Sequence, residues 1–318
     1  MLNLGYISFQ IQKSINTLTF KISIMTLDQD LQNIKRTIEE FKELTTRILQ
    51  HLTNVLNNYE EKNGYLIYSS DIAGTTKFIR PINKNMFLFD IPAFDSNYIK
   101  LKKVFGKIKS NKLLSQVEKD TIDCTIYTIQ QSIGIGLDLF VNPNSARKHV
   151  GNRFEELIKV IFTEIGIANK KIVLQIPYET DEGTKTYKCE NDLIISPYKT
   201  VKSTAKSIDK NEVIVSVKTT SKDRMGKMFI DKMLIEKFVD HPQKVIGIFL
   251  NDVQRKESDN VSYTLVSGLF MVYTQFLTKL EGVYYLDPPP NASRKPFSDH
   301  MKRFSDLIST DLKILLTP

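Results

Sequence analysis

The feature that most constrains the fold of this chain is a regular series of short apolar runs in its C-terminal half. Five runs rich in β-branched and aromatic residues are typical of strands: residues 171–179, 187–196, 212–220, 244–252 and 282–287. Apolar residues spaced by three and four predict helices over residues 226–240 and 269–280, and a closing helix over 297–316. A short turn and a basic loop separate the first three strands, which predicts an antiparallel meander. This order favours an α/β fold, a mixed sheet flanked by helices.

A further helix is predicted directly before the first strand, over residues 143–165. Its apolar side chains recur at helical spacing after Pro143, with Asn144 or Ser145 as the N-cap. Gly166 is the predicted stop, because glycine adopts the left-handed conformation that often ends a helix.

We place a domain boundary near residue 142, between an N-terminal region, 1–142, and a C-terminal domain, 143–318. The N-terminal region is predicted to be mainly helical. Apolar residues recur at spacings of three and four from residue 27 to about residue 59, which predicts one long amphipathic helix. A second helix is expected over 115–138. The long helix either packs on its own domain or forms the coiled-coil arm of a dimer.

The charge of the chain indicates a polyanionic partner. The 318 residues carry a net charge of +8, and the sequence pI is about 9.1. The segment from residue 197 to 237 holds ten Lys or Arg and five Asp or Glu, a net charge of +5. Such a balance suits nucleic acid or an acidic membrane surface, without choosing between them.

The two cysteines, Cys124 and Cys189, exclude a disulfide framework and a cysteine-based zinc site. A reducing, cytoplasmic setting is expected. The sequence lacks an apolar run of 18 residues, so no transmembrane helix is predicted. Polar residues interrupt the first 25 residues, which argues against a signal peptide, and the start lies at Met1 or at Met25.

Two charged residues stand where predicted strands reach one edge of the sheet. Asp192 opens an apolar run, and Lys218 ends the next one. In a meander these side chains can meet. A carboxylate and a lysine at one edge suit phosphodiester hydrolysis, where the carboxylate holds a divalent cation and the lysine orients or deprotonates water and stabilises the developing anion. With no His or Cys nearby, an oxygen-liganded Mg²⁺ is the expected cofactor.

A single aspartate would hold such a cation weakly, so a second carboxylate is expected. Glu155 lies at the edge of the apolar face of the helix before the sheet, whereas Glu156 points further out. Asp231 is spaced with the apolar residues of the helix after Lys218, where an unpaired charge is costly. Each acid alone has an ordinary alternative, as a turn residue or a helix-dipole partner. Both Glu155 and Asp231 remain candidates for the second ligand.

Together these residues resemble the PD-(D/E)XK nuclease superfamily, and within it the type II restriction endonucleases. The resemblance covers roughly residues 143–287. "GNRFEELI" is similar to the Gly-x-x-Phe-Glu helix of that family, which implies that Glu155 completes the metal site. "ENDLII" stands where the family has Pro-Asp, so Asp192 matches the aspartate, and "SVK" places Lys218 at the family's lysine.

The resemblance departs from the usual pattern at Ser216, which occupies the acidic position of the motif. One branch of the family, which cuts sites with a CCGG core, carries Ser-x-Lys here and takes its missing carboxylate from the next helix. Asp231 matches that position approximately. The same branch reads bases with an Arg/Asp/Arg cluster, which "KDR" (Lys222, Asp223 and Arg224) resembles.

The expected activity is Mg²⁺-dependent, sequence-specific hydrolysis of double-stranded DNA, performed by a homodimer because palindromic sites have two-fold symmetry. A cognate DNA methyltransferase acting on the same site is the implied companion. Sequence-independent phosphate contacts are expected from a further set of basic residues: Arg147, Lys148, Lys199, Lys202, Lys206 and Lys210. Two alternatives stay open, a branched-DNA or repair nuclease of the same fold, and a DNA-binding protein whose nuclease site is inactive.

Overall fold

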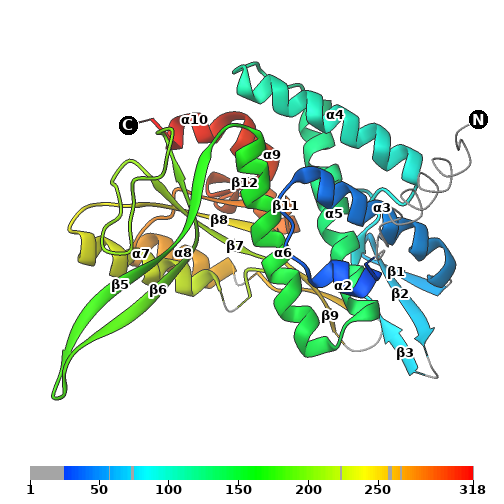
Figure 1. The fold of residues 1–318 in the computed structure, drawn as a ribbon, viewed down its shortest axis with the longest axis horizontal. Helices are drawn as coiled ribbons and strands as arrows, with labels where there is room; N and C mark the ends of the chain where they lie inside the picture. Colours follow the sequence, from blue (N-terminus) through cyan, green and yellow to red (C-terminus); the bar gives the residue numbers. More distant parts are fainter. Residues whose placement is uncertain are drawn as a thin grey trace, which may run out of the picture.

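A computed structural model describes residues 25–56, 58–72, 75–222, 224–256, 260–265 and 267–317. At its centre lies a six-stranded mixed sheet with strand order β12-β11-β8-β7-β6-β5. Helices cover both faces of this sheet, and the N-terminal helices stand to one side of it (Figure 1). The predicted α/β class with a mixed, helix-flanked sheet is therefore confirmed. Among the described residues, no helix has the length and apolar character needed to cross a membrane.

The first three strands of the sheet form the predicted antiparallel meander. Strand β5 (Ala168–Thr180) pairs along its length with β6 (Gly183–Ser196), and Gly183 has a φ of +108° in the tight turn between them. Strand β6 pairs with β7 (Val213–Lys218) only near the C-terminal end of β6, through Leu193, Ile194 and Ile195. The outer part of the β5–β6 hairpin therefore extends well beyond the body of the protein (Figure 1).

The other half of the sheet is parallel. Helix α7 (Met225–Val239) connects β7 to its parallel neighbour β8 (Lys244–Asn251). Strand β11 (Gly282–Asp287) lies parallel to β8 and follows helix α8 (Ser267–Phe276). Apart from the first residue of β8, these two strands are buried, which is why the sequence shows them as continuous apolar runs.

The predicted closing helix over residues 297–316 is wrong in its first part. A 3-10 turn (Phe297–Asp299) and strand β12 (Met301–Arg303) occupy that stretch, and Met301 is buried beside Val283 of β11. Pairing with the sheet edge outweighs helical spacing there. Helical turns follow in three consecutive pieces: α9 (Phe304–Asp306), a π-helical turn (Leu307–Asp311) and α10 (Leu312–Leu315).

The long N-terminal helix is also wrong, because the chain breaks it in two. Helix α2 (Leu27–Gln32) ends before the extended Asn33, and α3 (Ile38–Val55) starts anew. Thr37 caps α3 in a capping box with Glu40, and this local bonding competes with a continuous helix. The apolar spacing carries across the break because both helices bury the same kind of face.

The rest of the N-terminal region adds a small sheet to the expected helices. Its strands β1, β2, β3 and β4 span Asn58–Lys62, Tyr65–Ile72, Thr75–Phe78 and Ile82–Asn83. Helix α4 (Ile91–Lys109) precedes α5 (Gln116–Phe140), which confirms the second predicted helix. Helix α5 is buried along almost its whole length, so it forms the centre of this region.

Helix α6 (Pro143–Glu164) joins the two parts of the chain. Its cap is Asn142, whose side chain accepts a hydrogen bond from the Asn144 amide, so the predicted caps lie two or three positions too late. Gly166, with a φ of +83°, follows its end as predicted. One hydrophobic core contains residues from both sides of position 142, among them Leu31, Ile133, Phe154 and Val215.

A buried carboxylate ties the small sheet to the large one. Asp287, at the end of β11, accepts hydrogen bonds from the Tyr65 hydroxyl (2.9 Å) and the Asn83 side-chain amide (2.8 Å). Burial raises the pKa of Asp287 to about 6. Because this carboxyl binds its proton more tightly in the folded chain, its contribution to stability is full below about pH 4 and is lost as the pH rises to about 6.

We therefore expect Asp287→Asn to flatten the pH dependence of stability. Between pH 4 and pH 6 the melting temperature of the wild type should fall relative to that of the variant, and above pH 6 the difference should stay constant. Thermal melts at pH 4, 5, 6 and 7 measure this. Asp181→Asn, in the exposed hairpin turn, is the control. Parallel curves for wild type and Asp287→Asn would contradict the assignment.

Candidate active site

The structure brings Asp192 and Lys218 into direct contact. The Lys218 ammonium donates to Asp192 Oδ2 at 2.5 Å, and the Val217 amide donates to the same oxygen at 2.9 Å. The Ser216 hydroxyl lies 3.4 Å from it. These contacts arise because β6 and β7 are antiparallel and Leu193, the residue after Asp192, pairs with Val215. The Asp192 carboxylate is thus fixed by β7 backbone and faces the end of that strand.

Glu155 reaches the same lysine from helix α6. Its Oε1 accepts from Lys218 at 3.2 Å, and its Oε2 accepts from Lys171 of β5 at 3.3 Å. Burial raises the pKa of Glu155, and the neighbouring Asp192 charge acts in the same direction. Two carboxylates from different elements therefore share one ammonium group.

Glu156 turns away from this cluster, but it does not point further out as predicted, because its side chain is 20% exposed and that of Glu155 is 21% exposed. It accepts from Arg153 at 2.6 Å and from the Lys35 amide at 3.0 Å. Arg153 is almost fully buried, and it also donates to the Asn33 carbonyl oxygen. Glu156 thus anchors the α2–α3 connection on α6, next to Glu155.

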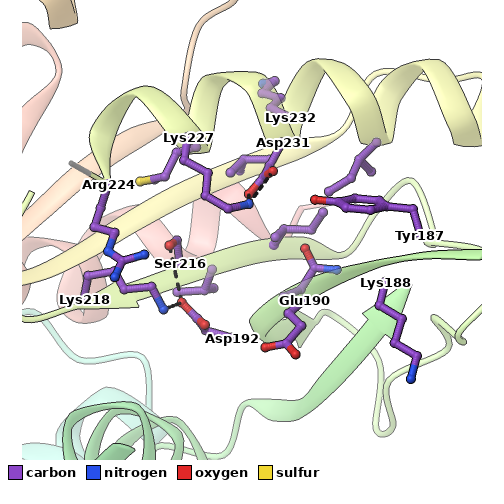
Figure 2. Close-up of a pocket in the computed structure, with 16 residues that line it drawn as sticks. Tyr187, Lys188, Glu190, Asp192, Ser216, Lys218, Arg224, Lys227, Asp231 and Lys232 are labelled. Atoms are coloured by element: carbon purple, nitrogen blue, oxygen red, sulfur yellow. Dashed lines mark hydrogen bonds and ion pairs between the residues drawn. The ribbon is translucent and has the colours of Figure 1, made fainter. Parts of the chain in front are cut away.

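Asp231 lies on α7, across a pocket from the sheet. This pocket has a volume of about 300 Å³ and is lined by Asp192, Ser216, Lys218 and Asp231, among others (Figure 2). The Asp231 carboxylate is half-buried and pairs with Lys227 one turn earlier, at 2.7 Å.

The charge of Asp231, which would be costly if unpaired among apolar residues, therefore has a protein partner in this structure. Lys227 compensates its charge. The apolar spacing misled because α7 is apolar on most sides: Ile230 and Met233 are exposed, at 57% and 43%. The spacing of Asp231 with apolar residues does not define which face of this helix is buried.

The side chains around Lys218 suit a hard divalent cation by their chemistry. Asp192, Glu155 and Asp231 would offer only carboxylate oxygens, the donors that Mg²⁺ prefers. In the arrangement that the described residues adopt, no group of three His, Cys, Asp or Glu side chains closes around one point. Instead, Lys218 forms an ion pair with Asp192, and Lys227 forms one with Asp231. The three carboxylates are therefore suitable ligands for Mg²⁺, and in this structure each of them is paired with a lysine.

The predicted DNA-binding residues divide into two groups. Arg147, Lys222 and Arg224 line a second pocket of about 430 Å³, together with Glu155 and Lys218. Arg224 and Lys218 also line the first pocket, so the two pockets meet at the lysine. Asp223 lies outside the described residues.

The other predicted lysines lie away from these pockets. Lys148, Lys199, Lys202, Lys206 and Lys210 are exposed, and none of them lines either pocket. The loop after β6 packs against β5, through a 2.7 Å bond from the Gln175 amide to the Ala205 carbonyl. The ammonium group of Lys202 lies 3.4 Å from the centre of the Tyr198 ring.

Sequence reasoning missed two lysines that contact the predicted acids, Lys171 and Lys227. Lys227 stands four residues before Asp231, a spacing that places both on one side of a helix and was available as a signal. Lys171 had no such signal. Its contact with Glu155 depends on how α6 crosses β5.

Comparison with solved structures identifies the fold. The crystal structure of the type IIP restriction endonuclease Kpn2I superposes with a TM-score of 0.68, at 18% identity, over 88% of this chain and 91% of that one. This chain has a type II restriction-endonuclease-like fold. A complex of the restriction endonuclease PspGI with substrate DNA matches at 11% identity and a TM-score of 0.40, over 70% of this chain and 91% of that one, which adds no weight.

Sequence comparison adds nothing to this assignment, because no protein-family model and no curated protein matches the chain. The fold nevertheless confirms the resemblance to type II restriction endonucleases, while the branch that cuts CCGG-core sites stays a prediction. The structural likeness covers far more of the chain than the short motifs do, because the superposition reaches well beyond residues 143–287.

Proposed function

We propose that this protein is a type II restriction endonuclease that hydrolyses double-stranded DNA at a specific sequence with Mg²⁺. The observation that carries the proposal is the convergence of Asp192 and Glu155 on the ammonium group of Lys218. This cluster sits where two pockets meet, and Arg147, Lys222 and Arg224 supply positive charge beside it. The restriction-endonuclease-like fold supports the same interpretation.

Each side chain of the cluster has a role that follows from its position. Lys218 would hold the attacking water and stabilise the anion that develops on the phosphate. Asp192, Glu155 and Asp231 would hold Mg²⁺, which when bound supplies an activated water and neutralises phosphate charge. The Val217 amide keeps Asp192 oriented through its 2.9 Å bond to one carboxylate oxygen, in a pocket that Asp192 lines.

The basic residues around the two pockets would bind the DNA backbone. Arg147, near the start of α6, and Arg224, at the start of α7, both carry charge that phosphate oxygens attract. Lys222, Asp223 and Arg224 remain the proposed base-reading cluster, and a CCGG core remains the proposed site type.

The remaining features belong to the same proposal. The enzyme would act as a homodimer in the cytoplasm, alongside a DNA methyltransferase that protects the same site. The region 1–142 would serve recognition or dimerisation, and 143–318 would carry the chemistry. A catalytically inactive DNA-binding protein is the competing function, favoured by Ser216 at the position where the family has an acid.

The decisive experiment is digestion of whole bacterial genomic DNA with purified protein, with Mg²⁺ and with EDTA. Discrete fragments that require Mg²⁺ are expected, and sequencing their ends gives the site. A Mg²⁺-dependent smear would instead indicate a nonspecific or structure-selective nuclease. DNA that stays intact, but is bound in gel-shift assays, would favour the inactive DNA-binding protein.

A further inference from the structure

A two-stranded ribbon, separate from the main sheet, lies beside the proposed active site. Strands β9 (Val253–Lys256) and β10 (Asn260–Tyr263) pair only with each other among the described strands. The ribbon follows directly after β8, and Figure 1 shows β9 near the N-terminal end of α6. Nothing in the proposed chemistry uses it.

One face of this ribbon is occupied by the N-terminal region. Val253 and Val261 pack with Tyr65 and Ile67 of β2. On the same face, the guanidinium of Arg255 lies 4.7 Å from the centre of the Phe78 ring. Because side chains alternate along a strand, residues 254 and 262 must face the other way.

That other face is polar and is directed at the proposed base-reading cluster. Gln254 and Ser262 are cross-strand partners, and their side chains lie 3.5 Å apart. The side-chain oxygen of Gln254, Oε1, accepts a hydrogen bond from the Lys222 ammonium at 3.3 Å. Gln254 also lines a cavity of about 620 Å³, which shares Arg147 and Thr219 with the pocket at Lys218. The ribbon therefore continues the surface that starts at the active site.

A buried carboxylate fixes the ribbon to the loop that follows Lys218. Asp252 is fully buried at the base of β9 and accepts from the Ser221 amide (2.6 Å) and from the hydroxyls of Thr220 (3.1 Å), Thr264 (3.2 Å) and Tyr285 (2.7 Å). Through Asp252, these bonds connect the residue before β9, the residue after β10 and the loop after Lys218 to Tyr285 of β11. Burying a charge is costly unless hydrogen bonds compensate it, so this clamp indicates that the spacing between Lys218 and Gln254 matters.

We propose that the polar face of the β9–β10 ribbon, with Gln254 as its principal residue, reads a base pair of the DNA site beside the pairs contacted by Lys222 and Arg224. A two-stranded ribbon fits the major groove, and a glutamine amide can bond both N6 and N7 of adenine there. Arg147, across the cavity, would hold the flanking phosphate. This inference rests on the proposed function, because it names the determinant of specificity for that same site.

The test is the sequence profile of Gln254→Ala. Wild type and variant are assayed for cleavage on duplexes that carry the cognate site, each with one base pair replaced. For Gln254→Ala, we expect the ratio of cleavage rates on cognate and substituted duplexes to fall by about 10- to 100-fold at one base pair. In a palindromic site the same loss should occur at the two-fold-related base pair. At all other base pairs the ratio should stay as in the wild type. Gln275→Ala, an exposed glutamine on α8 that lines none of these cavities, is the matched control.

Two results would overturn the inference while leaving the proposed function intact. In one, wild type cuts a specific site and Gln254→Ala has an unchanged profile. In the other, the variant slows equally on every duplex, which marks a structural or phosphate-contacting role. Wild-type protein that cuts no DNA with Mg²⁺, or cuts it without sequence preference, would overturn the proposed function and this inference together.

Discussion

Replacing Lys218 with alanine is expected to slow DNA cleavage by about 10³-fold or more, the size typical for loss of one general acid–base or anion-stabilising group. The side chain lies between Asp192 and Glu155 and is 29% exposed, so it faces the pocket rather than the core. It is the last residue of β7, and alanine keeps the backbone ladder. The folded structure should therefore survive while the chemistry is lost.

Single-turnover cleavage of a duplex that carries the site measures this loss, and a gel shift in EDTA measures DNA binding. Binding by Lys218→Ala should stay within about threefold of wild type, because one phosphate-facing lysine adds little to affinity. Lys171→Ala is the matched control. This variant removes the other lysine that contacts Glu155. Because the Lys171 side chain is 52% exposed, its loss should reduce the cleavage rate by less than about tenfold. Cleavage by Lys218→Ala at the wild-type rate would exclude the proposed role.

The sequence predicted the part of the fold that buried strands determine. Runs such as residues 213–217 and 245–250 are apolar because parallel and central strands are covered on both faces, and no other element explains them as well. The meander followed from the short turn between β5 and β6 and from the absence of a predicted helix in the basic loop between β6 and β7. That meander was sufficient to predict that Asp192 and Lys218 meet at one edge of the sheet.

Other features were not predicted, for local as well as for long-range reasons. The break between α2 and α3 depends on the local capping box at Thr37, which helical spacing conceals. Strand β12 is three residues long and depends on Met301 fitting beside β11. The lysines that contact Glu155 and Asp231 are set by helix-to-sheet packing and by one helical turn. The β9–β10 ribbon is hard to predict because its apolar face packs on β2, nearly 200 residues earlier in the chain.

The second large effect is expected from Asp192→Asn. Asparagine keeps an oxygen for the Val217 amide, so the local backbone should hold, but it removes the charge that would bind Mg²⁺. Cleavage should fall by about 10³-fold, comparable to loss of a key electrostatic group. A second measurement is independent of activity. At 100 times its dissociation constant, Mg²⁺ should stabilise the wild type by about 2.7 kcal/mol, and this increment should vanish in the variant.

Thermal melts with and without Mg²⁺ also separate the two candidate second ligands. Glu155 and Asp231 face Asp192 from opposite elements, α6 and α7, and each is held by a lysine that a cation would displace. If Mg²⁺ uses both, Glu155→Gln and Asp231→Asn should each reduce the Mg²⁺-dependent shift. If one acid is only a partner of its lysine, its variant should keep the shift. Glu179→Gln, on the outer hairpin, should leave both shift and cleavage unchanged. A full Mg²⁺ shift in Asp192→Asn would mean that the cation binds elsewhere, and the proposed division of roles would fail.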